Sequence, residues 1–420
     1  MSDSLGVWHG ERLVGTLRRG RGDRLSFEYA SPWLDDPHAF AISVSLPLVA
    51  GPIEGQAAHA FFANLLPEGQ VRVAVARRLG LSASNDFGLL EAIGGECAGA
   101  LAVLPGSARP SGGAAVYESL APETVAELAR RHSVLAELVG THGARLSLAG
   151  AQDKLPVRFD PDGSLWLPLG GAPSTHILKI PSRDFKHLPA NEVLVTKLAR
   201  ALALETVEAD LLRVAGTEVA VTRRYDRVVD GAAIVRLHQE DMCQALGLMP
   251  GTKYEQEGGP SFTDSLGIVR MCSAEPLIDA VQMLRWLLFA LLAGNSDGHG
   301  KNVSLVHTRG GGLRLAPFYD LVCTRVYPRL DRRQAMGIGG ERDPGQIGRS
   351  QLETLATEAD VGKRLVLREV KELATAMPTA FDEVATWYIT AHGSTPIIER
   401  LRRAIRDQCR RTLRLLAARN

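Results

Sequence analysis

The amino-acid sequence predicts an α+β protein with a mixed first half and a mainly helical second half. Short apolar runs typical of strands lie in residues 5–29 and 144–226, whereas helical patterns dominate from Gln239 onward. The chain has 420 residues, and a single hydrophobic core stops growing at about 250–300 residues. We therefore expect two or three packed units.

The first predicted unit covers residues 1–140. Two strand-like runs within residues 5–29 predict a hairpin, and the apolar positions of residues 59–79 predict helices. Residues 107–113 are rich in proline, glycine and serine, which is typical of a linker. The amphipathic pattern of residues 122–139 predicts a helix that closes this unit.

The rest of the sequence divides into two further parts. In residues 141–226, strand-like runs surround one predicted helix over residues 191–203, which indicates a sheet crossed by a helix. Residues 227–420 are predicted to be mainly helical, with one hairpin around the turn at residues 308–312. The sequence thus predicts three parts, residues 1–140, 141–226 and 227–420.

Composition and charge exclude several classes of protein. The chain is 45% hydrophobic and 23% charged, which is typical of a folded, water-soluble protein. Lys and Arg number 48 against 47 Asp and Glu, and the net charge of +1 gives no global attraction to nucleic acid or membrane. The five cysteines form no CxxC pair, and the most apolar run, Trp286–Ala293, is far shorter than the ~20 residues that span a bilayer. We expect a cytoplasmic protein without a membrane span, a disulfide framework or a zinc ribbon.

The most informative stretch runs from Gly294 to Asn302 and is followed by Asp320. A phosphotransfer site needs a carboxylate that orients the attacking hydroxyl, an amide oxygen on magnesium, and a second carboxylate on the ion that bridges the phosphates. Asp297 and Asn302 have the D-x-x-x-x-N spacing, and Asp320 follows across a predicted hairpin. Asp and Asn are also common in glycine-rich turns, where they cap the backbone. The pattern is stronger because a lysine and a glycine-containing loop precede it in kinase order.

Lys179 and the loop before it are candidates for phosphate binding. Lys179 lies between apolar residues of a predicted strand, where a lysine is costly unless it meets an anion; the alternative is a lysine that reaches solvent. Glu192 is a candidate partner for Lys179, or else a residue that interacts with the helix dipole. Small residues in Arg145–Lys154 let backbone amides approach phosphate, and the alternative here is a plain turn.

Six ordered segments resemble the signatures of the HipA family of bacterial kinases. They are Ser147–Lys154, Thr175–Lys179, Gln239–Gln244, Lys253–Glu255, Asp297–Asn302 and Pro317–Asp320. The resemblance implies a two-lobed, protein-kinase-like fold, with a mixed α/β N-terminal lobe and a mainly helical C-terminal lobe.

The resemblance also implies roles for individual residues. Asp297 would be the catalytic carboxylate, and Asn302 and Asp320 would bind Mg²⁺. Arg223 would begin a hinge beside adenine, although this position is often acidic in the family. The implied nucleotide-binding residues are Ala149, Gly150, Ala151, Gln152, Asp153, Lys154, Lys179, Arg223, Arg224, Tyr225, His299, Gly300, Lys301, Asn302, Tyr319 and Asp320.

The family further implies regulation and partners. Ser147 matches the serine that family members autophosphorylate, a change that adds about −2 charge and can expel the loop from its ATP-binding pose. The resemblance implies a HipB-like helix-turn-helix antitoxin, with the chain as co-repressor that reaches DNA only through this partner. It also implies ATP as a cofactor and an aminoacyl-tRNA synthetase as substrate, glutamate-tRNA ligase foremost, whose phosphorylation inhibits translation and favours growth arrest and persistence.

Two other classes of function were weighed. A small-molecule phosphotransferase would use the same metal chemistry, but such enzymes usually place histidine two residues before the catalytic aspartate, where this chain has Asn295. Residues 1–140 would also be superfluous for it. A non-catalytic co-repressor scaffold would need none of Asp297, Asn302 or Asp320. The sequence therefore favours an ATP-dependent serine/threonine protein kinase.

Overall fold

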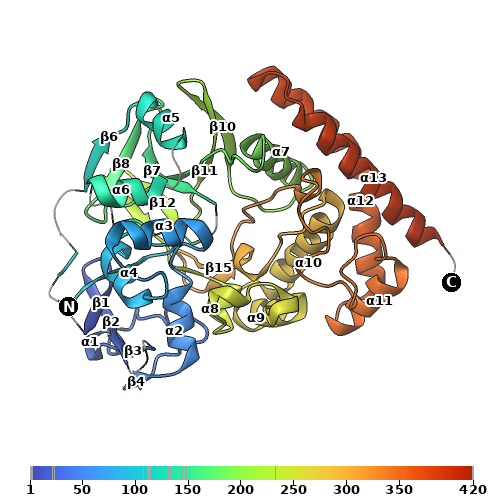
Figure 1. Cartoon of the computed structure of the whole chain (residues 1–420). Coiled ribbons are helices and arrows are strands. Elements are labelled where there is room, and N and C mark those ends of the chain that lie inside the picture. Colours follow the sequence, from blue (N-terminus) through green and yellow to red (C-terminus); the bar gives the residue numbers. More distant parts are fainter. Residues whose placement is uncertain are drawn as a thin grey trace. The chain divides into compact units, whose positions relative to one another are not determined.

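The computed structural model describes residues 3–20, 22, 24–106, 108–110, 115–130, 134–142, 145–147, 149–150, 152–231 and 233–418. The chain forms two compact units, each built from several stretches of sequence (Figure 1). The first unit contains Met1–Ile180, Arg213–Thr252 and Val306–Gly311, and the second contains Pro181–Leu212, Lys253–Leu305 and Gly312–Asn420. The chain-order division at residues 140 and 226 stays a prediction.

The first unit contains a five-stranded antiparallel sheet with the order β4-β3-β2-β1-β5. The pairing of β2 with β3 confirms the hairpin predicted in residues 5–29. Leu25, Phe27 and Tyr29 point to the buried face, and the ring of Phe27 packs on Phe62 of the covering helix α2. The strands are β1 (Ser4–His9), β2 (Arg12–Arg19), β3 (Leu25–Tyr29), β4 (Pro52–Ile53) and β5 (Leu101–Pro105).

Four helices accompany this sheet, namely α1 (Ser31–Leu34), α2 (Gln56–Ala63), α3 (Gly69–Leu79) and α4 (Asp86–Ile93). The helices predicted over residues 59–79 are α2 and α3. Helix also covers the described part of the helix predicted over residues 122–139, as α5 (Pro122–Arg130) and α6 (Val134–His142). Residues 131–133, between the two, lie outside the described residues.

A second sheet has the strand order β10-β11-β9-β7-β8-β6. Its central strand β9 is antiparallel to both β7 and β11. Its strands are β6 (Val116–Ser119), β7 (Lys154–Phe159), β8 (Leu165–Leu169), β9 (His176–Lys179), β10 (Ala209–Val214) and β11 (Thr217–Arg223). The first unit also contains the hairpin β12 (Arg227–Asp230) and β13 (Ala233–Arg236), β14 (Gln239–Asp241), α8 (Met242–Ala245) and the 3₁₀ turn η2 (Pro250–Thr252).

The second unit is mainly helical. Its long helices are α7 (Leu188–Ala201), α9 (Phe262–Cys272), α10 (Pro276–Ala293), α11 (Arg349–Glu358), α12 (Lys363–His392) and α13 (Ile397–Ala417). The 3₁₀ turns η3 (Glu255–Glu257), η4 (Gly300–Asn302) and η5 (Thr324–Val326) and the strand β16 (Leu313–Leu315) complete it, while the strand β15 (Ser304–His307) begins in this unit and ends with two residues of the first. β15 and β16 form the hairpin predicted around residues 308–312.

The core of the second unit is built around α10 and α12. Trp286, Leu288 and Phe289 of α10 are buried, and α12 packs along both α10 and α13 (Figure 1). Arg285 of α10 forms an ion pair with Glu369 of α12. These contacts make α10 a rigid support for the loop that follows it.

Candidate active site

The loop that carries Asp297 begins where α10 ends. The helix stops at Gly294, whose φ of +72° lies in the left-handed region that glycine tolerates best. The hydroxyl of Thr324 donates a hydrogen bond to the Gly294 carbonyl (3.1 Å) and accepts one from the Ser296 N–H (2.9 Å). A buried helix and a buried threonine therefore fix the start of the loop.

The carboxylate of Asp297 is held in place and is still open to a second molecule. Its side chain is 47% exposed. The hydroxyl of Tyr254 donates a hydrogen bond of 2.6 Å to Asp297 Oδ1, and His299 Nε2 lies 3.9 Å from the same oxygen. The Asp297 N–H donates to Oδ1 of the buried Asn295 at 3.0 Å. This arrangement orients the carboxylate before any substrate arrives, as a preorganised catalytic group requires.

Asn302 is tied to the backbone of Asp297. Its amide nitrogen donates a hydrogen bond of 2.8 Å to the Asp297 carbonyl. Because the nitrogen is used in this way, the amide oxygen is directed elsewhere and can serve as a ligand. The turn η4 passes so close to Pro260 that a Cβ at Gly300 would lie 2.5 Å from the proline Cγ. Glycine is therefore required for this packing.

Asp320 has a backbone conformation that is unusual for its residue type. Its φ of +54° is left-handed, and such positions cost on the order of 1–3 kcal/mol and concentrate at functional sites. The preceding residues hold it there. The ring of Phe318 stacks on Trp286 with 5.8 Å between centroids, and the hydroxyl of Tyr319 donates to the Lys301 carbonyl at 2.7 Å. The segment of Asp320 is thereby linked to the residue before Asn302.

Asn302 and Asp320 fit a magnesium ion better than a zinc ion. Among the described residues, no group of three or more His, Cys, Asp or Glu side chains could hold a metal. Zinc sites need three or four such ligands, whereas Mg²⁺ is usually bound by one or two protein oxygens together with phosphate oxygens and waters. An oriented amide oxygen and a carboxylate are donors of this second kind.

The sequence analysis did not identify Asn191, which braces the segment after Asp320. Asn191 lies in α7 and is fully buried. Its amide donates to the Cys323 carbonyl (3.0 Å) and accepts from the Cys323 N–H (3.0 Å), and a further bond of 3.2 Å joins it to the Tyr327 hydroxyl. The available signal was a polar residue within an otherwise apolar run. Its neighbour Glu192 is also buried, and the predicted pairing with Lys179 stays a prediction.

In the first unit, two lysines stand opposite each other on neighbouring strands. Lys154 of β7 is in register with Lys179 of β9, which is 4% exposed. Gly150 has a φ of +113°. A Cβ at this position would lie only 2.9 Å from Nζ of Lys154, so the ammonium of Lys154 is close to the glycine backbone. The positive charge of Lys154 thus lies against a glycine backbone within the predicted phosphate loop. Ala151 of the same loop lies outside the described residues.

Ser147 is completely buried. Its hydroxyl donates to the Leu65 carbonyl at 2.7 Å, and its N–H donates to the Glu96 carbonyl at 2.9 Å. The Gly150 carbonyl accepts a hydrogen bond of 3.1 Å from the Glu68 N–H. In this conformation the serine hydroxyl is enclosed, so phosphorylation of Ser147 requires its segment to move outward.

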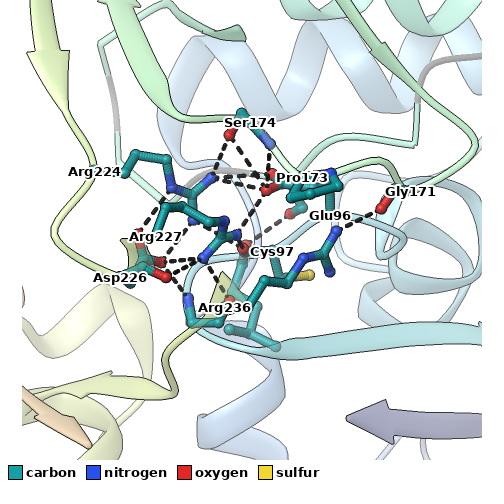
Figure 2. A network of polar contacts seen from close by, with 12 residues as sticks. Glu96, Cys97, Gly171, Pro173, Ser174, Arg224, Asp226, Arg227 and Arg236 are labelled. Carbon is teal, nitrogen blue, oxygen red and sulfur yellow. Dashed lines mark hydrogen bonds and ion pairs between the residues drawn. The ribbon is translucent and has the colours of Figure 1, made fainter. Parts of the chain in front are cut away.

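The predicted hinge residues have different environments. Arg224 is buried and forms ion pairs with Glu96 and Asp226, as Figure 2 shows. Its guanidinium is therefore committed to the protein, and any contact with adenine would involve the main chain. The Tyr225 hydroxyl donates to Gln239 at 2.6 Å, and Arg223 is in register with His176 at the exposed end of β11.

One described helix, α10, is long and apolar enough to span a membrane. Its 18 residues have a mean hydropathy of 1.5. In the structure, 67% of this segment is buried among other elements of the protein. This is the environment of a core helix.

Comparison with known proteins agrees with this geometry. Residues 146–381, more than half of the chain, match the family described as the HipA-like C-terminal domain, and residues 5–104 match the HipA N-terminal domain. The chain belongs to the HipA family. The HipA structure from Shewanella oneidensis MR-1, solved with HipB and its operator DNA, aligns with a TM-score of 0.83 and 27% identity over 98% of both chains. The predicted α+β, HipA-like fold class is confirmed.

Relatives in sequence are named as kinases. The Sinorhizobium fredii protein Y4mE, whose name describes it as a candidate kinase, is 39% identical over 92% of this chain and 93% of its own length. The serine/threonine-protein kinase toxin HipA of Shewanella oneidensis is 29% identical over 89% of this chain and 88% of its own length. Membership in this HipA kinase family implies the use of ATP.

Proposed function

We propose that the protein is a Mg²⁺- and ATP-dependent serine/threonine protein kinase and the toxin of a HipBA-like toxin–antitoxin system. The observation that carries the proposal is the linked arrangement of Asp297, Asn302 and the Tyr319–Asp320 segment. It supplies one oriented, half-exposed carboxylate and two oxygen donors for a metal. An oriented carboxylate and metal ligands are the main groups that a protein supplies for phosphoryl transfer, because positioning of the reactants and stabilisation of charge account for most of the catalysis.

In the proposed reaction, Asp297 orients the hydroxyl of a substrate serine or threonine. The hydroxyl oxygen forms a bond to the γ-phosphorus of ATP, the bond from that phosphorus to the bridging oxygen breaks, and ADP leaves. Asp297 accepts the hydroxyl proton, and Tyr254 keeps the carboxylate in the required orientation. Mg²⁺ bound by Asn302 and Asp320 would neutralise charge on the phosphates.

The nucleotide-binding part of the proposal rests on the first unit. Lys154 brings its ammonium close to the backbone of Gly150, and Lys179 is in register with Lys154 on the neighbouring strand, which supports phosphate binding by residues 149–154. We assign adenine to the main chain of residues 223–225. Autophosphorylation of Ser147 would trap its segment outside this pocket, because a phosphate cannot occupy the enclosed position of its hydroxyl.

The proposed partners follow from the HipA relatives. The Shewanella oneidensis HipA structure contains HipB and operator DNA, which supports a HipB-like helix-turn-helix antitoxin for this chain and contact with DNA through that partner. The net charge of +1 agrees with weak binding of the chain alone to DNA. As substrate we propose an aminoacyl-tRNA synthetase, glutamate-tRNA ligase first, with inhibition of translation and growth arrest as the result.

The test is incubation of the purified chain with labelled ATP and Mg²⁺, alone and with a panel of aminoacyl-tRNA synthetases. We expect label on Ser147 and on one synthetase, and a loss of transfer of about 10²–10⁴-fold in Asp297→Asn. Asp331→Asn is the matched control, because Asp331 is a similarly exposed carboxylate (53%) of the same unit that pairs with Arg333. Ser147→Ala should lose self-labelling and retain transfer to the synthetase.

The outcomes separate the alternatives. Label on small hydroxyl compounds and on no protein would indicate a small-molecule phosphotransferase. Nucleotide-free binding of an antitoxin, with no transfer under any condition, would indicate a co-repressor scaffold. Full activity in Asp297→Asn would contradict the proposed catalytic role.

A further inference from the structure

A buried ionic network in the first unit joins segments that are far apart in sequence (Figure 2). Its centre is Glu96, whose side chain is 0% exposed. Glu96 Oε2 accepts from Arg224 Nη1 at 3.0 Å, and Oε1 accepts from Arg227 Nη2 at 2.6 Å and from the Ser174 hydroxyl at 3.3 Å. We call Glu96, Ser174, Arg224, Asp226 and Arg227 the Glu96 network.

The loop around Glu96 is braced to residues 224–227 by its main chain as well. The Cys97 carbonyl accepts hydrogen bonds from both Arg224 (3.1 Å) and Arg227 (3.0 Å). The Gly99 N–H donates to Asp226 at 2.7 Å. Seven hydrogen bonds between described residues therefore join residues 96–99 to residues 224–227 as a single rigid element, since their charges are satisfied away from water.

The main chain of Glu96 holds a third segment, the one that contains Ser147. Glu96 forms a parallel bridge with Leu146, in which its N–H donates to the Arg145 carbonyl at 2.8 Å and its carbonyl accepts from the Ser147 N–H at 2.9 Å. The side chain of Glu96 thus holds the proposed hinge, and its main chain holds the approach to the proposed phosphate loop.

The charge state of Glu96 is fixed by its neighbours. Burial alone would raise the pKa of Glu96, but Arg224 and Arg227, helped by Arg236, lower it to about 2. The carboxylate is therefore ionised at every pH that a cell experiences. Its neutralisation would leave buried guanidinium groups without their counter-charge, and the structure would have to adjust around them.

We propose that Glu96 is a positioning residue that sets residues 145–147, the approach to the proposed phosphate loop, against residues 224–227, which contain part of the proposed hinge, so that its loss weakens ATP binding selectively. This inference rests on the proposed function of both segments. Glu96 lies within residues 5–104, which match a separate N-terminal family domain. The inference therefore gives that domain a part in forming the nucleotide site. The same bridge must break before Ser147 can leave its buried position.

The test compares Glu96→Gln, which removes the charge and keeps the shape, with Asp86→Asn. Asp86 is the matched control because it is a buried carboxylate within the same N-terminal region, and its partners Arg72 and His59 also lie there. The readouts are the dissociation constant of a non-hydrolysable ATP analogue with Mg²⁺, the KM for ATP and kcat, and amide hydrogen exchange in residues 145–150 and 224–227.

We expect Glu96→Gln to weaken analogue binding by about 2- to 30-fold, the range of couplings carried by packed networks. KM should rise accordingly with little change in kcat, and exchange should increase in both segments together. Glu96→Asp, which keeps the charge, should recover part of the affinity, and it provides the test if Glu96→Gln does not fold. Asp86→Asn should bind the analogue like the wild type.

Unchanged affinity in a folded Glu96→Gln protein would overturn the inference, as would equal weakening in Asp86→Asn. So would a rise in exchange in one segment without the other. Failure of the wild-type chain to bind the analogue would instead contradict the proposed kinase function, and the exchange measurement would still decide whether Glu96 couples the two segments.

Discussion

Replacing Asn191 by alanine should destabilise the second unit strongly. The substitution removes two hydrogen bonds of 3.0 Å to Cys323 and leaves the buried N–H and carbonyl of that residue without their partner. Each unsatisfied buried group costs about 1–3 kcal/mol, so the free energy of unfolding should fall by about 2–6 kcal/mol. For a unit of this size, each kcal/mol lowers Tm by about 2–4 °C, and we expect a decrease of at least about 4 °C.

The measurement is calorimetry of Asn191→Ala beside Thr196→Val. Thr196 is the matched control, because it is equally buried on the same helix and, among the described residues, its hydroxyl has no hydrogen-bond partner. Its replacement by valine should change Tm little. Asn191→Ala should also raise the Mg²⁺ concentration needed for phosphate transfer, since Cys323 follows Asp320 by three residues. A Tm within about 2 °C of the wild type would refute the reasoning.

Two further predictions concern a buried histidine and the tyrosine beside the proposed catalytic carboxylate. Burial, together with the charge of His9, lowers the pKa of His307 to about 4. As the pH falls below 6.5, His307 therefore binds a proton in the unfolded chain and stays neutral in the folded chain, so the free energy of unfolding decreases. His307→Phe should therefore make the fall in unfolding free energy shallower by about 1.4 kcal/mol per pH unit between pH 6 and 4.5, and an unchanged slope in denaturant titrations would contradict the assignment. Tyr254→Phe loses one hydrogen bond to the half-exposed Asp297, which water can partly replace, so kcat should fall by about 2- to 10-fold in the transfer assay. A loss as large as that of Asp297→Asn would mean that Tyr254 does more than orient the carboxylate.

Local patterns made much of the second unit predictable. The apolar run of α10, the glycine that ends it and the five-residue interval from Asp297 to Asn302 are close in sequence, so they determine one another's geometry. The same holds for the hairpin of β15 and β16 before Asp320. Amphipathic periodicity likewise predicted helix over residues 122–139, where α5 and α6 are the helical segments that the structure describes.

The contacts that brace the site are of another kind. Asn191 and Cys323 are 132 residues apart, and Glu96 and Arg224 are 128 residues apart. No local pattern marks such pairs, because a buried amide or carboxylate has the same sequence signature as an exposed one until its partner is known. Arg224 illustrates this, since the ion pairs of its guanidinium with Glu96 and Asp226 could not be foreseen from the sequence, while its place in a hinge beside adenine stays a prediction.

By itself, the sequence determined the fold class and the residues whose chemistry suits phosphoryl transfer, because these depend on periodicity and short spacings, and its ordered motifs indicated the family by resemblance. Only the tertiary structure decided that Ser147 is enclosed, that Asp320 adopts a left-handed backbone and that Glu96 joins residues 145–147 to residues 224–227. These properties depend on which distant groups satisfy one another's hydrogen bonds and charges away from water. That selection is made by packing the whole chain.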